Sequence, residues 1–421
     1  MKVLIITYYW PPAGGSGVQR WLKFVKYLQA FGIEPVIFTA DNANYAKEDI
    51  SLLSEVPKNI EILKRAIWEP TDLLFWKKNK QQKNGVSNIS KGGLLSFIRG
   101  NFFIPDPKIF GVQPAVNYLQ KYIDKNDIDA IISSGPPHSM HLIAQKLHYQ
   151  NNVKWLADFR DPWSNLYYNK DFKQGSFAKN KNKKLEEGVL KNADCILTVS
   201  TTLQQEFSKI AKRVEVITNG FDDEVSASEK VALDANFSIS YIGLLPKQSN
   251  PKLLFKVLKE LCQESAAFKN DLQINFIGDI SEEVKIEIES NNLTKNTSFT
   301  GYVSHQKAIA YQKKSQVLLL LIPNVDNNKG ILTGKVFEYL IAKRPILAIG
   351  PEEGDLATIL KETNAGVVIN FDAEEKLKLQ INKLYQQFKG GELIVNATNI
   401  QKYHRKELTK NLAVLLKSLN S

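Results

Sequence analysis

The 421-residue sequence contains only two cysteines, Cys195 and Cys262, which lie in different halves of the chain, each within an apolar run. So few thiols exclude a disulfide-stapled domain and a cysteine metal site, and they favour a reducing compartment. Apolar runs are short as well: none reaches the roughly 18–20 residues of a membrane-spanning helix, and the run 3–10 is typical of a strand rather than of a signal peptide. These absences predict a cytoplasmic protein whose contact with a membrane is confined to its surface.

Two kinds of sequence pattern are also missing. No repeat of 20–50 residues occurs, which argues against a solenoid. The loop after the first apolar run contains Gly14, Gly15 and Gly17, but these lack the G-x-G-x-x-G spacing of a dinucleotide-binding fold. Small residues in this loop still allow a ligand to approach the backbone closely. The alternative is that they form a tight turn and nothing more.

The net charge of +11 is unevenly distributed. Residues 1–220 hold 30 Lys and Arg against 20 Asp and Glu, a balance of +10, whereas residues 221–421 hold 25 against 24, a balance of +1. The basic excess of the first half suggests an anionic partner, such as a membrane surface, a phosphorylated lipid or a nucleic acid.

Short apolar runs alternate with amphipathic helical patterns along most of the chain, which predicts two successive doubly wound α/β domains. The first spans 1–221 and includes a basic, aromatic insertion at 41–110. A polar linker at 222–236 follows. The second domain spans 237–396, and a helix at 397–421 ends the chain.

The stretch 329–349, KGILTGKVFEYLIAKRPILAI, carries the clearest sign of a ligand. Gly334 precedes a predicted helix in which Lys335 and Glu338 share one side, and Pro345 opens the next strand. A glycine turn before a helix N-terminus is a ready anion site. The cation could meet a phosphate while the carboxylate accepts two sugar hydroxyls, as a nucleotide sugar requires. The alternative is a capped helix with an exposed Lys–Glu pair.

Polar residues also follow two strands of the first domain. His138 and His141 open the helix after the strand at 130–133, and Asp161 follows the strand at 153–159. Ligands of open α/β sheets bind at the carboxyl ends of strands, so all three are candidates for contacts with a substrate. Alternatively, the histidines are structural and Asp161 forms a buried bridge with Arg160.

Residues 64–110 combine nine Lys and Arg and three acids with clusters of aromatic residues. Aromatic rings at headgroup level, flanked by cations, are typical of a segment that binds an anionic membrane. This pattern predicts docking on such a membrane through residues that include Phe75 and Trp76. The alternative is that the aromatics pack on the first domain and the lysines are solvated.

Taken together, these segments resemble the retaining GT-B glycosyltransferases of family four and group 1, and among them the enzymes of bacterial surface-polysaccharide biosynthesis. The resemblance covers the whole chain except parts of 41–110. It rests on the Gly14-Gly15 loop, the Ser134–His141 turn, the 155–163 stretch, the Asn219-Gly220-Phe221-Asp222 crossover, the Gly243–Lys247 loop, and Glu338 before Tyr339-Leu340. It implies two Rossmann-like domains facing a central cleft, with the C-terminal helix packing back toward the N-terminal domain.

The resemblance also implies roles for single residues. Gly14 and Gly15 would let the backbone meet the donor diphosphate and the acceptor. Lys247, Lys335 and the backbone of Gly334 would contact the diphosphate. Glu338 would bind the donor ribose as the second glutamate of the E-x7-E motif. Such enzymes bind the diphosphate without a metal, so neither a metal nor a cofactor is expected.

The sequence departs from the family pattern at two positions. Gly330 stands where the first glutamate of E-x7-E is usual, and Leu244 stands where many relatives have arginine. The first change removes the usual carboxylate near the donor sugar. The second leaves Lys247 with more of the diphosphate charge.

The predicted function is glycosyl transfer from a nucleoside-diphosphate sugar to a lipid-linked or saccharide acceptor, on the cytoplasmic side of an anionic membrane. His141 or His138 would position acceptor or donor sugar, and Asp161 would contact the acceptor. One alternative is a sugar-nucleotide epimerase of the same fold, which needs no acceptor site. Another is a non-catalytic protein that binds an anionic surface or nucleic acid; the near-neutral second half and its anion site disfavour nucleic acid as a partner.

Overall fold

The computed structural model describes the chain apart from residues 46, 69–93, 165–173, 223–230 and 421. Parts of the predicted insertion 41–110 and linker 222–236, as well as Phe75 and Trp76, therefore lie outside the described residues. The chain divides into two compact units. Unit 1 comprises Met1–Asn219 and Arg405–Ser421, and unit 2 comprises Gly220–His404.

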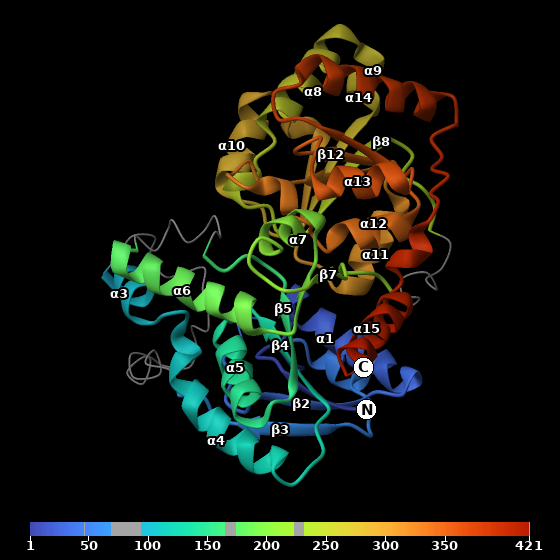
Figure 1. Ribbon diagram of the computed structural model, residues 1–421. Coiled ribbons are helices and arrows are strands. Elements are labelled where there is room, and N and C mark those ends of the chain that lie inside the picture. The colour runs from blue at the N-terminus through green and yellow to red at the C-terminus, as the bar shows by residue number, and fades with distance from the viewer. Residues whose placement is uncertain (46, 69–93, 165–173, 223–230, 421) are drawn as a thin grey trace. The chain divides into compact units, whose positions relative to one another are not determined.

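Unit 1 is built on a seven-stranded parallel sheet with the order β3-β2-β1-β4-β5-β6-β7 (Figure 1). Its strands are β1 Lys2–Ile6, β2 Glu34–Ala40, β3 Glu61–Arg65, β4 Ala130–Gly135, β5 Lys154–Phe159, β6 Cys195–Thr198 and β7 Val214–Val216. Its helices are α1 Ser16–Leu28, α3 Leu94–Phe102, α4 Val112–Ile123, α5 Ser139–Asn151, α6 Ser176–Asn192, α7 Thr201–Phe207 and α15 Arg405–Leu419. Apolar clusters on both faces of the sheet confirm the doubly wound architecture.

The C-terminal helix α15 packs against α1, as predicted for the end of the chain. Leu408, Leu412, Leu415 and Leu416 of α15 recur at helical spacing and are buried in the same cluster as Trp21 and Leu22 of α1. Burying each leucine contributes about 1.5–3 kcal/mol, which is enough to hold the helix on unit 1.

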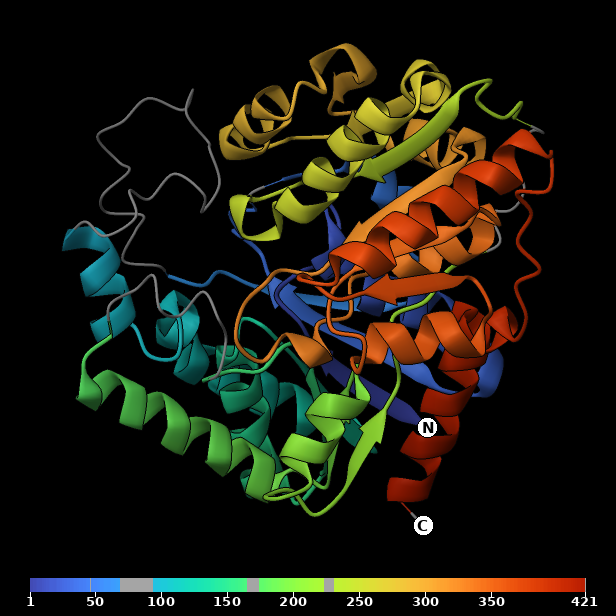
Figure 2. The same cartoon turned by 90° about the horizontal axis from the view of Figure 1, so that it is seen from above.

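Unit 2 has a six-stranded parallel sheet with the order β10-β9-β8-β11-β12-β13. Its strands are β8 Phe237–Ile242, β9 Leu272–Ile277, β10 Thr297–Gly301, β11 Val317–Leu321, β12 Ile346–Ile349 and β13 Gly366–Ile369. Its helices are α8 Lys252–Glu264, α9 Ala266–Asp271, α10 Glu282–Ser290, α11 His305–Lys314, α12 Lys335–Ala342, α13 Asp355–Glu362 and α14 Glu374–Lys389. Figures 1 and 2 show these helices on both faces of the sheet, each covering an apolar cluster.

One strand was missed in the sequence analysis. β3 lies within the predicted insertion, yet it pairs in parallel with β2 and forms an edge of the unit 1 sheet. Its sequence, EILKR, buries only Leu63 fully. An edge strand needs little apolar surface, so its hydrophobic pattern is too weak to stand out.

Among the described residues, no helix has the length and apolar character needed to cross a membrane.

Candidate functional site

Each sheet changes winding direction at one point, between β1 and β4 in unit 1 and between β8 and β11 in unit 2. Ligands of doubly wound sheets bind at such a point, outside the carboxyl ends of the strands. The predicted donor-binding residues follow β1 in unit 1, and β8 and β11 in unit 2. Each unit therefore gathers its own predicted residues at the edge where this architecture binds ligands.

Helix α12 presents an open N-terminus at this edge of unit 2. It starts directly after Gly334, an exposed residue with helical dihedrals (φ −58°, ψ −22°) and no side-chain cap within the described chain. The buried hydroxyl of Thr333 likewise finds no hydrogen-bond partner there. First-turn amides that no side chain caps can donate to an anion, and the helix dipole favours negative charge.

Lys335, the first residue of α12, does not extend freely into solvent. Its ammonium donates to the Tyr241 hydroxyl at 2.6 Å and lies 4.1 Å from the centre of the same ring. The Tyr241 hydroxyl donates in turn to the Leu244 carbonyl at 2.8 Å. Burial lowers the pKa of Lys335 to about 8, and nearby Glu338 partly opposes this shift. The lysine is therefore a positioned cation that has no anionic hydrogen-bond partner among the described residues.

Gly243 makes room for this arrangement at the end of β8. A Cβ atom at Gly243 would lie 2.6 Å from Lys335 Cε and 2.9 Å from its Nζ. The backbone of Gly243 also has φ +122°, which residues with a side chain rarely adopt. A glycine is needed here because the lysine side chain crosses the backbone at this point.

Glu338 lies one turn further along α12, on the same side as Lys335. Its Oε2 accepts from Gln312 Nε2 at 2.9 Å, and its Oε1 lies 3.3 Å from His305 Nε2. Gln312 is buried, whereas the side chain of Glu338 is about one-third exposed. The carboxylate is thus fixed from the protein side and remains accessible to a ligand.

The other predicted residue of unit 2, Lys247, occupies a different setting. It is exposed at the start of the short 3-10 turn Lys247–Ser249, in the loop after β8. Leu244, at the position where relatives often have arginine, is exposed in the same loop. Lys247 therefore lies on the loop that follows β8, the strand that carries Tyr241. Of the two lysines, Lys335 is the one that neighbouring side chains hold in a fixed geometry.

The two predicted glycines of unit 1 also differ from each other. The amide of Gly14 donates to the Lys47 carbonyl at 2.9 Å, so it is already engaged. Gly15 is exposed, has φ +85° and is the N-cap residue of α1. Of the two, Gly15 has the conformation and the open space that close approach of a ligand requires.

His138 and His141 lie together in a buried aromatic stack. His138 stacks on Trp163 with ring centres 4.6 Å apart, and His141 stacks on Phe159 at 4.5 Å. His141 Nδ1 hydrogen bonds with Ser133 Oγ at 2.8 Å, while His141 Nε2 and both His138 nitrogens lack a partner among the described residues. Burial lowers the pKa of His141 to about 3 and that of His138 well below its ordinary value. Both are therefore neutral imidazoles near pH 7.

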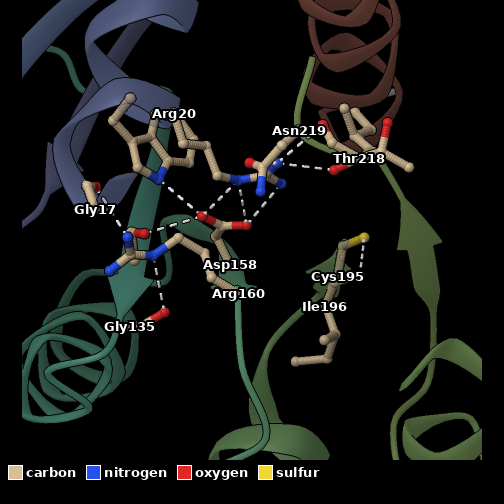
Figure 3. A network of polar contacts seen from close by, with 12 residues as sticks. Gly17, Arg20, Gly135, Asp158, Arg160, Cys195, Ile196, Thr218 and Asn219 are labelled. Atoms are coloured by element: carbon tan, nitrogen blue, oxygen red, sulfur yellow. Dashed lines mark hydrogen bonds and ion pairs between the residues drawn. The ribbon is translucent and has the colours of Figure 1, made fainter. Parts of the chain in front are cut away.

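Asp161 is exposed just after the end of β5, and among the described residues no hydrogen bond or ion pair joins it to Arg160, which was the alternative interpretation of this stretch. Arg160 instead donates to the backbone carbonyls of Gly135 at 3.1 Å and Gly17 at 2.9 Å (Figure 3), and to that of Pro136 at 2.5 Å. Arg160 thereby ties the loops after β1 and β4 to the end of β5. Asp161 is left accessible to a ligand.

The buried ion pair of unit 1 is formed by Arg20 and Asp158, which are 138 residues apart. Asp158 accepts from Arg20 at 2.9 Å, from Trp21 Nε1 at 2.8 Å and from Ser134 Oγ at 2.9 Å. Arg20 also donates to the Ile217 carbonyl at 2.8 Å. This network connects α1, β4, β5 and the end of β7 beneath the ligand-binding edge.

Sequence reasoning missed three residues of the unit 2 site: Tyr241, Gln312 and His305. From the sequence pattern, Tyr241 is expected to be one more apolar strand residue, and Gln312 is expected to face solvent from a helix. Their roles arise from contacts with Lys335 and Glu338 that span 94 and 26 positions. The only local signal was that Tyr241 stands directly before Ile242-Gly243 at a strand end.

An Asp-x-Asp sequence, which in other proteins can hold a metal beside a diphosphate, occurs at 127–129. It lies directly before β4, at the amino ends of the strands, where Asp129 Oδ2 accepts from the Lys2 amide at 2.6 Å. Ligands of such sheets bind at the opposite edge. The described residues contain no group of three or more potential metal ligands.

Two family models match this chain. Residues 88–225 match the model described as Glycosyltransferase Family 4, and residues 236–387 match the model described as Glycosyl transferases group 1. Between them the two matches cover well over half of the chain. Comparison with curated proteins gives no match.

Solved structures similar to this chain share its fold at low sequence identity. HepE from Anabaena in complex with UDP-glucose has a TM-score of 0.64 at 13% identity, covering 99% of this chain and 100% of that one. The lipopolysaccharide outer core galactosyltransferase WaaB has a TM-score of 0.59 at 16% identity, with 99% and 100% covered. A candidate UDP-N-acetylglucosamine 2-epimerase from Listeria monocytogenes has a TM-score of 0.57 at 12% identity, with 99% and 96% covered. These likenesses establish the GT-B fold, which transferases share with an epimerase candidate.

Proposed function

The chain is a glycosyltransferase of family 4, and we propose that it transfers a sugar from a nucleoside-diphosphate sugar to a hydroxyl of a lipid-linked or saccharide acceptor in the biosynthesis of a cell-surface polysaccharide. The observation that carries this proposal is the N-terminus of α12. It combines uncapped amides, the positioned ammonium of Lys335 and the accessible carboxylate of Glu338 on one helix. These groups suit a diphosphate and a ribose, the two parts common to such donors.

In this proposal, the role of the donor site is to stabilise the leaving group, which is the diphosphate of the donor. As the bond between sugar and diphosphate breaks, negative charge grows on the diphosphate. Lys335 and the α12 amides stabilise that charge from fixed positions, and Lys247 adds a cation from its loop. The transfer proceeds with retention, so the acceptor attacks on the face that the diphosphate leaves. A diphosphate oxygen can then take the acceptor proton, and the binding of the donor needs no metal.

The acceptor side of the proposal rests on unit 1. Asp161 is exposed and contacts the acceptor hydroxyls, while the neutral imidazoles of His138 and His141 position a sugar by hydrogen bonding rather than by charge. Gly15 provides an open stretch of backbone. The basic excess of this half suits an acceptor at the inner face of the cytoplasmic membrane, where lipid-linked saccharides present anionic groups.

Incubation with UDP- and GDP-sugars, without acceptor, tests the proposed reaction against its alternatives. Slow release of free sugar supports transfer to water in place of the acceptor. Formation of an isomerised sugar nucleotide would identify the protein as an epimerase. An unchanged donor would favour the third alternative, a non-catalytic binding protein. UDP-glucose is the first donor to test, because HepE was solved with it.

Replacing Glu338 with glutamine is expected to weaken donor binding about tenfold or more. The amide keeps the shape but loses charge-assisted hydrogen bonds to the ribose, each of which contributes roughly 1.5–3 kcal/mol. Isothermal titration with a sugar nucleotide measures the change, and thermal unfolding should be nearly unaltered. Glu353→Gln, on an exposed surface of the same unit, is the matched control. Unchanged affinity and turnover in Glu338→Gln would remove the ribose role.

Replacing His141 or His138 with alanine is expected to lower transfer without altering its dependence on pH between 5 and 8. Both imidazoles are already neutral in this range because burial depresses their pKa. Activity of the wild type and both variants across the range provides the measurement. Full transfer and normal acceptor affinity in His141→Ala would leave His138 as the positioning residue. Full activity in both variants would show that neither histidine positions the sugar.

A further inference from the structure

We propose that unit 1 docks on an anionic lipid bilayer through a surface formed by α3, α6 and the 3-10 turn Pro107–Gly111, here called the α3–α6 surface. Its exposed aromatic side chains are Phe97, Phe102, Phe110 and Phe177, together with Trp68, which packs on Phe110. The proposal names the partner that would present the acceptor proposed above, but its geometry is independent of the donor site.

Hydrogen bonds join the two helices at one end of this surface. The Asn101 side chain of α3 accepts from the Gly175 amide at 2.7 Å, and Gln174 donates to the Gly100 carbonyl at 3.1 Å. Figure 1 shows α3 beside the N-terminal end of α6. Phe102 and Phe177 therefore project from neighbouring helix ends, and 69% and 77% of their surfaces are exposed.

A second aromatic group continues the surface from the turn Pro107–Gly111. Phe110 packs edge-on against Trp68 at 5.2 Å and against Phe103 at 5.9 Å. Phe110 and Trp68 nonetheless remain about half exposed. Large apolar side chains that contact one another and remain open to water mark an interaction site rather than a closed hydrophobic core.

The charges on α6 identify the kind of partner. Lys181 and Lys184 follow Phe177 at i+4 and i+7, so the three share one side of the helix. Ala178, Asn182, Glu186 and Val189 form the buried side. Lys179, Lys181 and Lys184 are exposed and have no acidic partner within the described residues. Such a face suits anionic headgroups, while the phenyl rings enter the apolar boundary below them.

Co-sedimentation of the full chain with vesicles tests the proposal. Wild-type protein is expected to bind vesicles containing phosphatidylglycerol at low salt, to be released by high salt, and to ignore pure phosphatidylcholine. Because each lysine near the surface adds to the attraction for anionic lipid, Lys181→Glu/Lys184→Glu should reduce binding by about tenfold or more. Phe102→Ser/Phe177→Ser should reduce it comparably.

Two control variants distinguish binding through this surface from non-specific binding of the protein to vesicles. Leu379→Ser removes a side chain of unit 2 that is 68% exposed, and Lys361→Glu reverses an exposed charge there. Neither should change binding. Wild-type protein that stays in solution with anionic vesicles at low salt would overturn the proposal, as would surface variants that bind normally. A wild-type dimer that the Phe102→Ser/Phe177→Ser variant dissociates would also overturn it, since the surface would then join two copies of the chain.

Sugar release from the donor is measured in solution for every variant. Vesicle binding with no sugar release in any protein would contradict the proposed transfer and leave the docking surface intact. Sugar release without vesicle binding would support the proposed transfer and contradict the docking surface.

Discussion

Replacing Asp158 with alanine is expected to lower the free energy of unfolding of unit 1 by about 3–5 kcal/mol. The substitution leaves the Arg20 guanidinium buried without its counter-charge, and loss of one partner of a buried pair costs this much. It also removes the acceptor for Trp21 and Ser134. Because a typical domain is stable by only about 5–15 kcal/mol, this loss removes a large share of the stability of unit 1 and should lower its unfolding midpoint clearly.

Urea unfolding followed by tryptophan fluorescence provides the measurement, since Trp21 lies in the network itself. The exposed pair Arg213–Glu215 supplies the control, because Glu215→Ala should change stability by less than about 1 kcal/mol. A comparably small change in Asp158→Ala would mean that water or neighbouring groups satisfy Arg20, and that the network does not hold the ligand-binding edge together.

The same network shows where sequence reasoning ends. The alternative interpretation from the sequence paired Arg160 with its neighbour Asp161, but Arg160 donates to three carbonyls, and the carboxylate of the buried ion pair is Asp158. Its partner Arg20 lies 138 positions away, on the first helix. Periodicity reveals which face of an element is buried, but it carries no information about which distant polar groups meet there.

Elements with strong local patterns were predicted closely. The expected helix after Gly334 and the strand after Pro345 correspond to α12 and β12. Here glycine, the apolar periodicity and proline all favour the same boundaries. β3 was missed because one buried leucine is too weak a signal. The contacts of Lys335 were missed because nothing in the sequence around Tyr241, near the end of β8, indicates that its hydroxyl accepts a hydrogen bond from a distant lysine.

Replacing Lys335 with alanine is expected to weaken binding of a nucleoside diphosphate by about 10- to 150-fold, the equivalent of one charge-assisted contact of roughly 1.5–3 kcal/mol. Binding of the matching nucleoside monophosphate should change far less. Lys247→Ala should show the same selectivity, with a smaller loss because that side chain is exposed and makes no hydrogen bond or ion pair within the described part of the chain. Titration calorimetry with UDP and UMP, or with the GDP pair, distinguishes the cases. Equal losses for both ligands would indicate a general effect of charge.

The pH dependence makes this prediction more specific. Burial lowers the pKa of Lys335 to about 8 in the free protein, and a bound diphosphate must raise it again. Below pH 8 the ammonium is mostly charged before the ligand arrives. Above pH 8 binding must also take up a proton, so diphosphate affinity should fall by up to about tenfold per pH unit until the pKa of the bound state is reached.

Two further variants test whether Lys335 is the source of that dependence. The guanidinium of Lys335→Arg stays charged, so any diphosphate affinity it retains should be flat between pH 7 and 10. Tyr241→Phe keeps the ring beneath the ammonium but removes the hydroxyl that accepts from it at 2.6 Å. Without this bond the lysine is less well positioned, so diphosphate affinity should fall while monophosphate affinity does not. An unchanged pH profile in Lys335→Ala would assign the titration to another group and remove Lys335 from the diphosphate site.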